Sequence, residues 1–109
     1  MTDSASDAPT VLVVDDEPEV ADVYAFQLGR EYETQTAYGG AEALAAIDES
    51  VDVVLLDRRM PGRSGDEVLA EIRDRGLDCR VVMVTAIADP DFDILGMDFD
   101  DYLCKPVES

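Results

Sequence analysis

Histidine is absent from this 109-residue chain, and lysine occurs only once, at Lys105. Without histidine, the chain has no means of building a histidine-based zinc site, a Ser-His-Asp or Cys-His nucleophile pair, or a phosphohistidine of its own. The two cysteines, Cys79 and Cys104, come without a secretion signal, so we expect free thiols. No apolar run is long enough to cross a bilayer, and we expect a cytoplasmic protein with no membrane partner.

Positive charge is scarce: 8 basic residues stand against 26 acidic ones, which gives a net charge of −18. A surface this negative repels phosphate backbones, so we expect no direct nucleic acid binding by this segment. Aspartate outnumbers glutamate by 17 to 9. Together with the near-absence of lysine, this indicates a halophilic protein whose acidic surface is adapted to a salt-rich cytoplasm, where screening is short-ranged.

The length predicts one domain, and 47% of the residues are apolar, enough for a hydrophobic core. Residues 1–8 (MTDSASDA) are small and polar, which predicts a disordered N-terminal tail before a domain at 9–109. The acidic residues of that domain lie within apolar-periodic segments. This pattern favours a folded domain over a disordered acidic tract.

Short apolar runs alternate with helical patterns along the chain. TVLVV at 10–14, VDVVLL at 51–56 and VVMV at 81–84 are typical of strands buried on both faces. YETQTA at 32–37 alternates weakly and predicts an edge strand, and DYLC at 101–104 predicts the last strand. Helices are expected between them at 18–30, 41–47 and 66–75.

This order predicts an α/β protein with a doubly wound parallel sheet and helices on both faces. In such sheets, ligands bind beyond the carboxyl ends of the strands. Asp15 and Asp16 follow the first strand, Asp57 the third, Thr85 the fourth and Lys105 the fifth. We therefore expect three carboxylates, a hydroxyl and an ammonium group on one rim of the sheet.

Three close carboxylates repel one another, and a divalent cation relieves that repulsion. Mg²⁺ prefers oxygen ligands of this kind. A carboxylate that faces the metal can also act as a nucleophile toward phosphorus, with the metal and a lysine neutralising the phosphoryl oxygens. The rim therefore predicts Mg²⁺-assisted phosphoryl chemistry, with Thr85 as a hydrogen-bond donor.

Four stretches carry a family resemblance. They are VLVVDDE at 11–17, VVLLDRRMPGRSG at 53–65, VVMVTA at 81–86 and DYLCKP at 101–106. In this order the chain resembles a CheY-like receiver domain of a two-component response regulator. The resemblance implies a flavodoxin-like sheet with strand order 2-1-3-4-5.

The resemblance also implies site residues. Asp57 would be the phosphoacceptor, and Mg²⁺ would be held by Asp15, Asp16, Asp57 and the main-chain carbonyl of Arg59. Lys105 would pair with the phosphoryl group, where the compact ammonium of lysine is not replaced by the wide fork of arginine.

A second set of residues would carry the conformational switch. Thr85 would move to hydrogen-bond the phosphoryl oxygen, and Tyr102 would swing inward to fill the vacated space. Ala86 would stay small so that the phosphoryl group can enter. Arg59 and Ile87 occupy positions that tune how fast the phosphoryl group is lost in this family.

The implied partner is a sensor histidine kinase, which supplies phosphohistidine, and the implied output region lies beyond Ser109. The domain would catalyse its own phosphorylation and dephosphorylation and act mainly as a signalling switch, with homodimerisation as a further expectation. The chain departs from the family pattern in two places. The segment between Thr85 and Lys105 is short for the family, so we expect a short or irregular fourth helix. The fifth helix is missing, so we expect a C-terminally truncated piece of a longer regulator.

The sequence leaves alternatives open. A phosphorylation-independent interaction module, a pseudo-receiver, would share the fold. A phosphatase with an aspartate nucleophile would need a second acid where Arg59 stands. DPDFDILGMDFDD at 89–101 has part of the spacing of a calcium loop, but Ile94 stands where such a loop requires glycine. Glu17 would serve either the metal or the positive end of a helix dipole.

Overall fold

The computed structural model describes residues 8–85 and 101–104, with side chains for 8–84. The elements, in chain order, are β1 (Thr10–Val14), α1 (Pro18–Leu28), β2 (Glu33–Ala37), α2 (Gly40–Ala46), β3 (Val53–Asp57), α3 (Gly65–Asp74), β4 (Arg80–Thr85) and β5 (Asp101–Cys104). The expected tail, apart from Ala8, lies outside the described residues. The segment of the expected fourth helix also lies outside the described residues. The same holds for the calcium-loop candidate, except for its last residue, Asp101.

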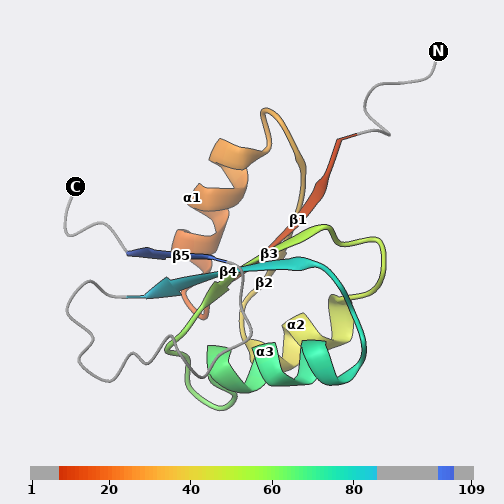
Figure 1. Cartoon of the computed structure of the whole chain (residues 1–109). Helices are drawn as coiled ribbons and strands as arrows, with labels where there is room; N and C mark the ends of the chain where they lie inside the picture. Colours follow the sequence, from red (N-terminus) through yellow and green to blue (C-terminus); the bar gives the residue numbers. More distant parts are fainter. Residues whose placement is uncertain (1–7, 86–100, 105–109) are drawn as a thin grey trace.

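The strands form one parallel sheet in the order β2-β1-β3-β4-β5 (Figure 1). The predicted parallel α/β architecture is therefore confirmed, and β2 lies at an edge as its weak alternation predicts. The central register sets Val14 beside Leu56 of β3 and beside Ala37 of β2. All strands run the same way, so their carboxyl ends share one rim of the sheet.

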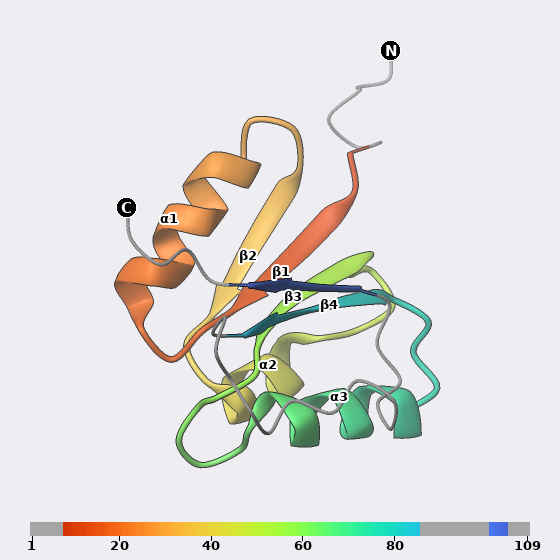
Figure 2. The same cartoon turned by 60° about the vertical axis from the view of Figure 1, so that its left-hand side comes forward.

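Helices cover both faces of the sheet, as the buried strands require. Figure 2 shows α1 on one face and α2 and α3 side by side on the other. Alternate strand residues supply the two cores, because successive side chains of a strand point to opposite faces. Leu12 and Leu56 belong to the core under α2 and α3, whereas Val13 and Leu55 pack with Ala21 of α1.

Local hydrogen bonds explain two small differences from the predicted boundaries. β3 begins at Val53, later than predicted, because the Val51 N–H donates to the Asp48 carbonyl (3.1 Å) in a turn. α1 ends at Leu28, earlier than predicted, because the Glu31 and Tyr32 N–H groups both turn back to the Leu28 carbonyl.

Local interactions define both ends of α3. The Ser64 hydroxyl accepts from the Glu67 N–H (3.2 Å) while the Glu67 carboxylate accepts from the Ser64 N–H (3.1 Å), which is a capping box. Gly76, just past the helix, has φ +79°, a conformation that favours glycine. In the described part of the chain, no helix combines the length and apolar character that a membrane crossing requires.

Candidate functional site

Three aspartates meet at the carboxyl rim of the sheet. Asp15 directly follows β1 and Asp57 ends β3, and the pairing of Val14 with Leu56 brings these two strand ends together. One carboxylate oxygen from each of Asp15, Asp16 and Asp57 lies within 4.8 Å of the others. Asp15 and Asp57 are each only 2% exposed, and Asp16 is half-buried. The structure thus brings together the three acids that the sequence singled out.

Backbone groups hold Asp15 in place. Its N–H donates to the Ala37 carbonyl at the end of β2 (3.1 Å), and its Oδ1 accepts from the Glu17 N–H (2.9 Å). Glu17 is the N-cap residue of α1, and the group of three acids does not include its carboxylate. Its contact with the site is therefore made by its main chain, which orients the Asp15 carboxylate.

The donor set of this site is oxygen only and strongly negative. Three carboxylates so close together, two of them removed from solvent, repel one another unless a cation lies among them. Hard divalent cations such as Mg²⁺ prefer carboxylate, carbonyl and water oxygens. The three side chains therefore fit a magnesium ion better than a soft transition metal, which would favour thiolate or imidazole.

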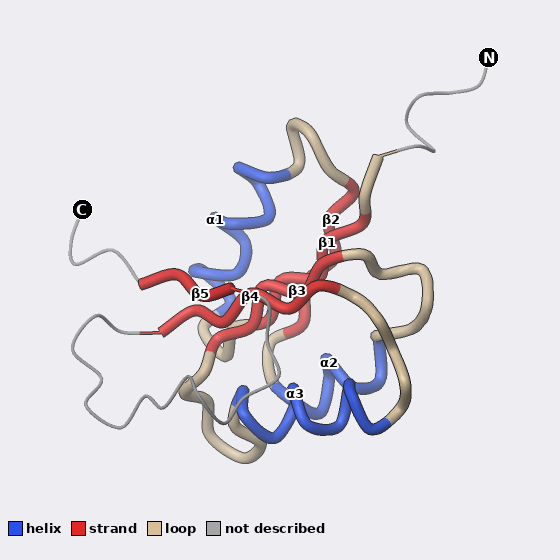
Figure 3. The backbone as a smooth tube through the Cα atoms, in the orientation of Figure 1, coloured by secondary structure: helices blue, strands red, loops and turns tan. Residues whose placement is uncertain are grey.

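The chain after Asp57 is fixed tightly to its surroundings. The Arg58 N–H donates to the Val84 carbonyl of β4 (2.9 Å), and the Arg58 carbonyl accepts from the Gly65 N–H (2.8 Å). Residues 59–64 therefore form a closed loop that leaves β3 and returns to the first residue of α3. Figure 3 shows this loop between β3 and α3 at the carboxyl rim.

Sequence reasoning missed the side-chain link across this loop. Arg58 is 8% exposed, and its guanidinium forms two parallel contacts with the Asp66 carboxylate: Nε to Oδ1 at 3.0 Å and Nη2 to Oδ2 at 3.2 Å. Arg58 follows the strand β3 and Asp66 lies in the helix α3, so the pair is not contained in one element and neither the helix period nor the strand period predicts it. The only signal in the sequence was a charged residue directly after a buried strand, which favours a partner.

The remaining predicted site residues are described in part or not at all. Thr85 ends β4, one residue beyond Val84, which pairs with Asp57, so its backbone lies at the same rim. Tyr102 lies in β5 opposite Met83. The side chains of Thr85 and Tyr102, and all of Ala86, Ile87 and Lys105, fall outside the described part.

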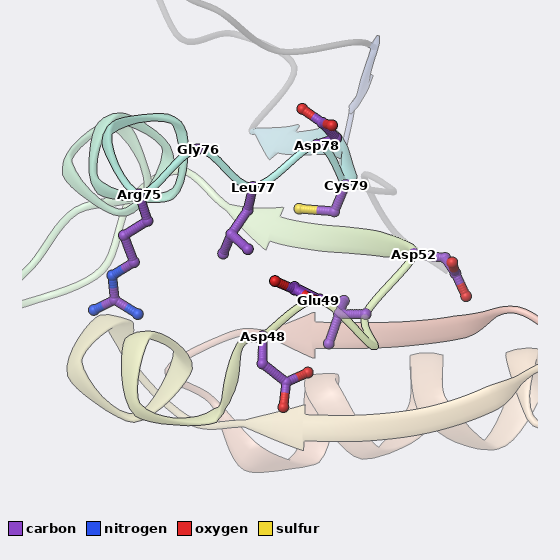
Figure 4. A pocket seen from close by; sticks show the side chains of 9 residues that line it. Asp48, Glu49, Asp52, Arg75, Gly76, Leu77, Asp78 and Cys79 are labelled. Carbon is purple, nitrogen blue, oxygen red and sulfur yellow. The ribbon is translucent and has the colours of Figure 1, made fainter.

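Another hollow lies at the opposite, amino end of the strands. It has a volume of about 390 Å³ and lies among the loops before β3 and β4, with Asp48, Asp52, Arg75, Leu77 and Cys79 in its lining (Figure 4). None of the predicted site residues whose side chains the structure describes contributes to it. Ligands of parallel α/β sheets bind at the carboxyl ends, so the three aspartates are the stronger candidate site.

Comparison with known proteins gives a consistent result. Residues 11–109 match the response regulator receiver domain family. A Haloferax volcanii protein, whose name places it among transcriptional regulators, is 60% identical over 98 residues, which are 89% of this chain and 17% of that protein. The chain thus spans about one sixth of the length of this relative.

Two solved structures resemble the fold closely. Response regulator TrrA from Thermotoga maritima, in complex with Mg(2+)-BeF, has a TM-score of 0.78 and 36% identity, covering 92% of this chain and 89% of that one. A structure of histidine kinase ThkA in complex with TrrA matches with a TM-score of 0.76 and 37% identity, covering 90% and 86%. The sequence match over 11–109, the parallel sheet and the acidic rim agree: this chain belongs to the response regulator receiver domain family.

Proposed function

We propose that this chain is a phosphoacceptor receiver in which Asp57 takes a phosphoryl group from a sensor histidine kinase in a Mg²⁺-dependent reaction. The observation that carries the proposal is the meeting of Asp15, Asp16 and Asp57 at one rim, with oxygens within 4.8 Å and two of the acids 2% exposed. Burying acids side by side is unfavourable, so the arrangement points to a bound cation and a reacting carboxylate.

Asp15, Asp16 and Asp57 would hold the metal together with the main-chain carbonyl of Arg59. When bound, Mg²⁺ neutralises charge on the three acids and on the incoming phosphoryl oxygens. The TrrA structure, which is in complex with Mg(2+)-BeF, supports a metal-binding receiver of this fold. Within the chain, the Glu17 N–H keeps one Asp15 oxygen in a fixed position through its 2.9 Å hydrogen bond.

In the transfer step, a carboxylate oxygen of Asp57 attacks the phosphorus of a phosphohistidine. A P–O bond forms on Asp57, the P–N bond breaks, and the imidazole of the kinase leaves with the bonding electron pair. The burial of Asp57 limits access of water to the resulting acyl phosphate. Lys105 would neutralise a phosphoryl oxygen, and Ala86 would leave room for the phosphoryl group.

The phosphorylated state would shift an existing conformational equilibrium. Thr85 would bond the phosphoryl oxygen and Tyr102 would move inward, which transmits the change to the β4–β5 edge. Arg59 and Ile87 would set the lifetime of the acyl phosphate. An unchanged dephosphorylation rate in Arg59→Asn would remove Arg59 from this role. The output region would lie beyond Ser109 in a longer protein.

We place the kinase on the α1 face. Val23 and Phe26, three residues apart on α1, are 55% and 79% exposed, and α1 begins directly after the acidic rim. Residues three apart on a helix are neighbours on its surface, and exposed apolar side chains that gather together mark interaction surfaces. The complex of ThkA with TrrA supports a kinase as the partner of a receiver of this fold.

The runner-up is a phosphorylation-independent interaction module of the same fold. The two proposals differ in one measurement, intact mass after incubation with acetyl phosphate and Mg²⁺. The receiver proposal expects one added phosphoryl group on the wild type and none on Asp57→Asn. The module proposal expects no addition on either protein.

A further inference from the structure

The most buried arginine of the described chain follows the phosphoacceptor directly. Arg58 is 8% exposed as a residue, and its side chain is 9% exposed against 39% for the side chain of Asp66. Its guanidinium meets the Asp66 carboxylate in two parallel contacts of 3.0 and 3.2 Å. Such a two-point contact fixes orientation as well as distance, which a single-point contact of lysine does not.

The Arg58–Asp66 salt bridge spans the β3–α3 loop, whose two ends are already joined by a main-chain hydrogen bond. The Arg58 N–H donates a hydrogen bond to the Val84 carbonyl of β4, and the Arg58 carbonyl accepts one from the Gly65 N–H of α3. Asp66 is the next residue of α3 and belongs to its first turn. The salt bridge therefore adds a side-chain link to the main-chain link, and together they leave the 59–64 segment with little freedom at either end.

Arg59 is the first residue of that closed segment, so the orientation of its carbonyl depends on how firmly Arg58 is held. We propose that the Arg58–Asp66 pair is a positioning device that fixes the β3–α3 loop and so sets the affinity of the site for Mg²⁺. The inference rests on the proposed function in that the Arg59 carbonyl is taken as a metal ligand. The side chains of Arg58 and Asp66 act on the metal only through that carbonyl.

Two simpler roles predict different behaviour. If the pair acted only through charge, removing the cation Arg58 would tighten Mg²⁺ binding and removing the anion Asp66 would weaken it. If the pair only stabilised the fold, both changes would lower the melting temperature and leave Mg²⁺ affinity unchanged. Positioning predicts that both single changes weaken Mg²⁺ binding, and that the double change is no worse than either one.

The test is a calorimetric Mg²⁺ titration of the whole chain as wild type, Arg58→Gln, Asp66→Asn and the double variant. We expect each variant to raise the Mg²⁺ Kd on the order of tenfold, as loss of an outer-shell partner does. Glu71→Gln is the matched control, since it removes an exposed ion pair to Arg75 (3.1 Å) at the other end of α3. It should leave the Kd unchanged. Opposite signs for Arg58→Gln and Asp66→Asn, or no change in either, would overturn the proposal.

A second readout separates this inference from the proposed function. Amide hydrogen exchange at Gly65, measured without metal, reports the loop directly because the Gly65 N–H donates to the Arg58 carbonyl. Arg58→Gln and Asp66→Asn should each speed exchange at Gly65 about tenfold, and Glu71→Gln should not. A wild type that binds no Mg²⁺ would refute the proposed metal site, while unchanged exchange at Gly65 would refute the positioning role of the pair.

Discussion

Gly65, the first residue of α3, lies against the main chain of Asp57. A Cβ at this position would overlap the carbonyl oxygen of Asp57 and lie 2.7 Å from the Cα of Arg58. The β3–α3 loop therefore returns so closely to the end of β3 that only a residue without a side chain fits. The first residue of α3 therefore packs directly against the main chain of Asp57, one of the three acids of the rim.

Gly65→Ala should destabilise the protein by about 2 kcal/mol, because the clashing atoms are backbone and cannot rotate away. Chemical denaturation in high salt measures the change. Gly39→Ala is the matched control, because Gly39 has an ordinary extended backbone (φ 168°) and a Cβ added there would meet nothing within 4 Å. Equal stability of the Gly65 variant and the wild type would show that the loop yields more readily than the structure indicates.

Phe26 on α1 should matter for the kinase and not for a small phosphodonor. Replacing this 79% exposed side chain with serine removes apolar contact area, and we expect phosphoryl transfer from a histidine kinase to slow about tenfold. Phosphorylation by acetyl phosphate should keep its wild-type rate, since Phe26 is not part of the acidic site. Parallel radiolabel time courses with the two donors make the comparison. If the serine variant and the wild type accepted phosphoryl groups from the kinase at equal rates, the kinase would dock on a surface other than the one around Phe26.

Potassium chloride should stabilise the fold. With a net charge of −18, repulsion between surface acids opposes folding at low ionic strength, and salt screens it. A gain of a few kcal/mol between about 0.1 and about 3 M corresponds to a rise in melting temperature on the order of 10 °C. Circular dichroism melts across this range measure it. Identical melting temperatures would contradict the halophile interpretation that the Haloferax volcanii relative supports.

Asp48, which precedes the amino end of β3, should titrate abnormally. Its pKa lies below the ordinary 3.8 because the Ser50 hydroxyl, and then the Ser50 N–H, donate to its carboxylate. A lowered folded-state pKa means that its contribution to stability is present above the ordinary pKa and is lost as pH falls through the folded value.

Ser50→Ala removes the first of these donors, so we expect the pKa of Asp48 to rise toward 3.8, as followed by carboxyl ¹³C NMR. Ser50→Thr keeps a hydroxyl and should keep the pKa low. A pKa in the alanine variant that matches the wild type would assign the shift to the backbone bond alone.

The fold and the acidic rim were both predictable from sequence for the same reason. TVLVV and the run before Asp57 are too apolar for a half-exposed strand, and in a parallel sheet the residues that follow such strands must meet at one rim. The prediction that Asp15, Asp16 and Asp57 come together is confirmed by the geometry. Their roles in phosphoryl transfer stay predictions.

Contacts across loops were not predictable. The Arg58–Asp66 pair joins residues eight apart through a turn whose path depends on tertiary packing, and no periodicity marks it. Nothing in the sequence around Gly65 indicates that this residue packs against the carbonyl of Asp57. Such close approaches follow from how α3 sits on the sheet, which only the assembled structure specifies.

The most direct test of the central claim is the intact mass of the whole chain after incubation with acetyl phosphate and Mg²⁺ in multimolar KCl. Asp57→Asn and a sample containing a chelator of divalent metals serve as controls. We predict one added phosphoryl group on the wild type and none in either control. An unmodified wild type, or a modified Asp57→Asn, would contradict the assignment of Asp57 as the phosphoacceptor.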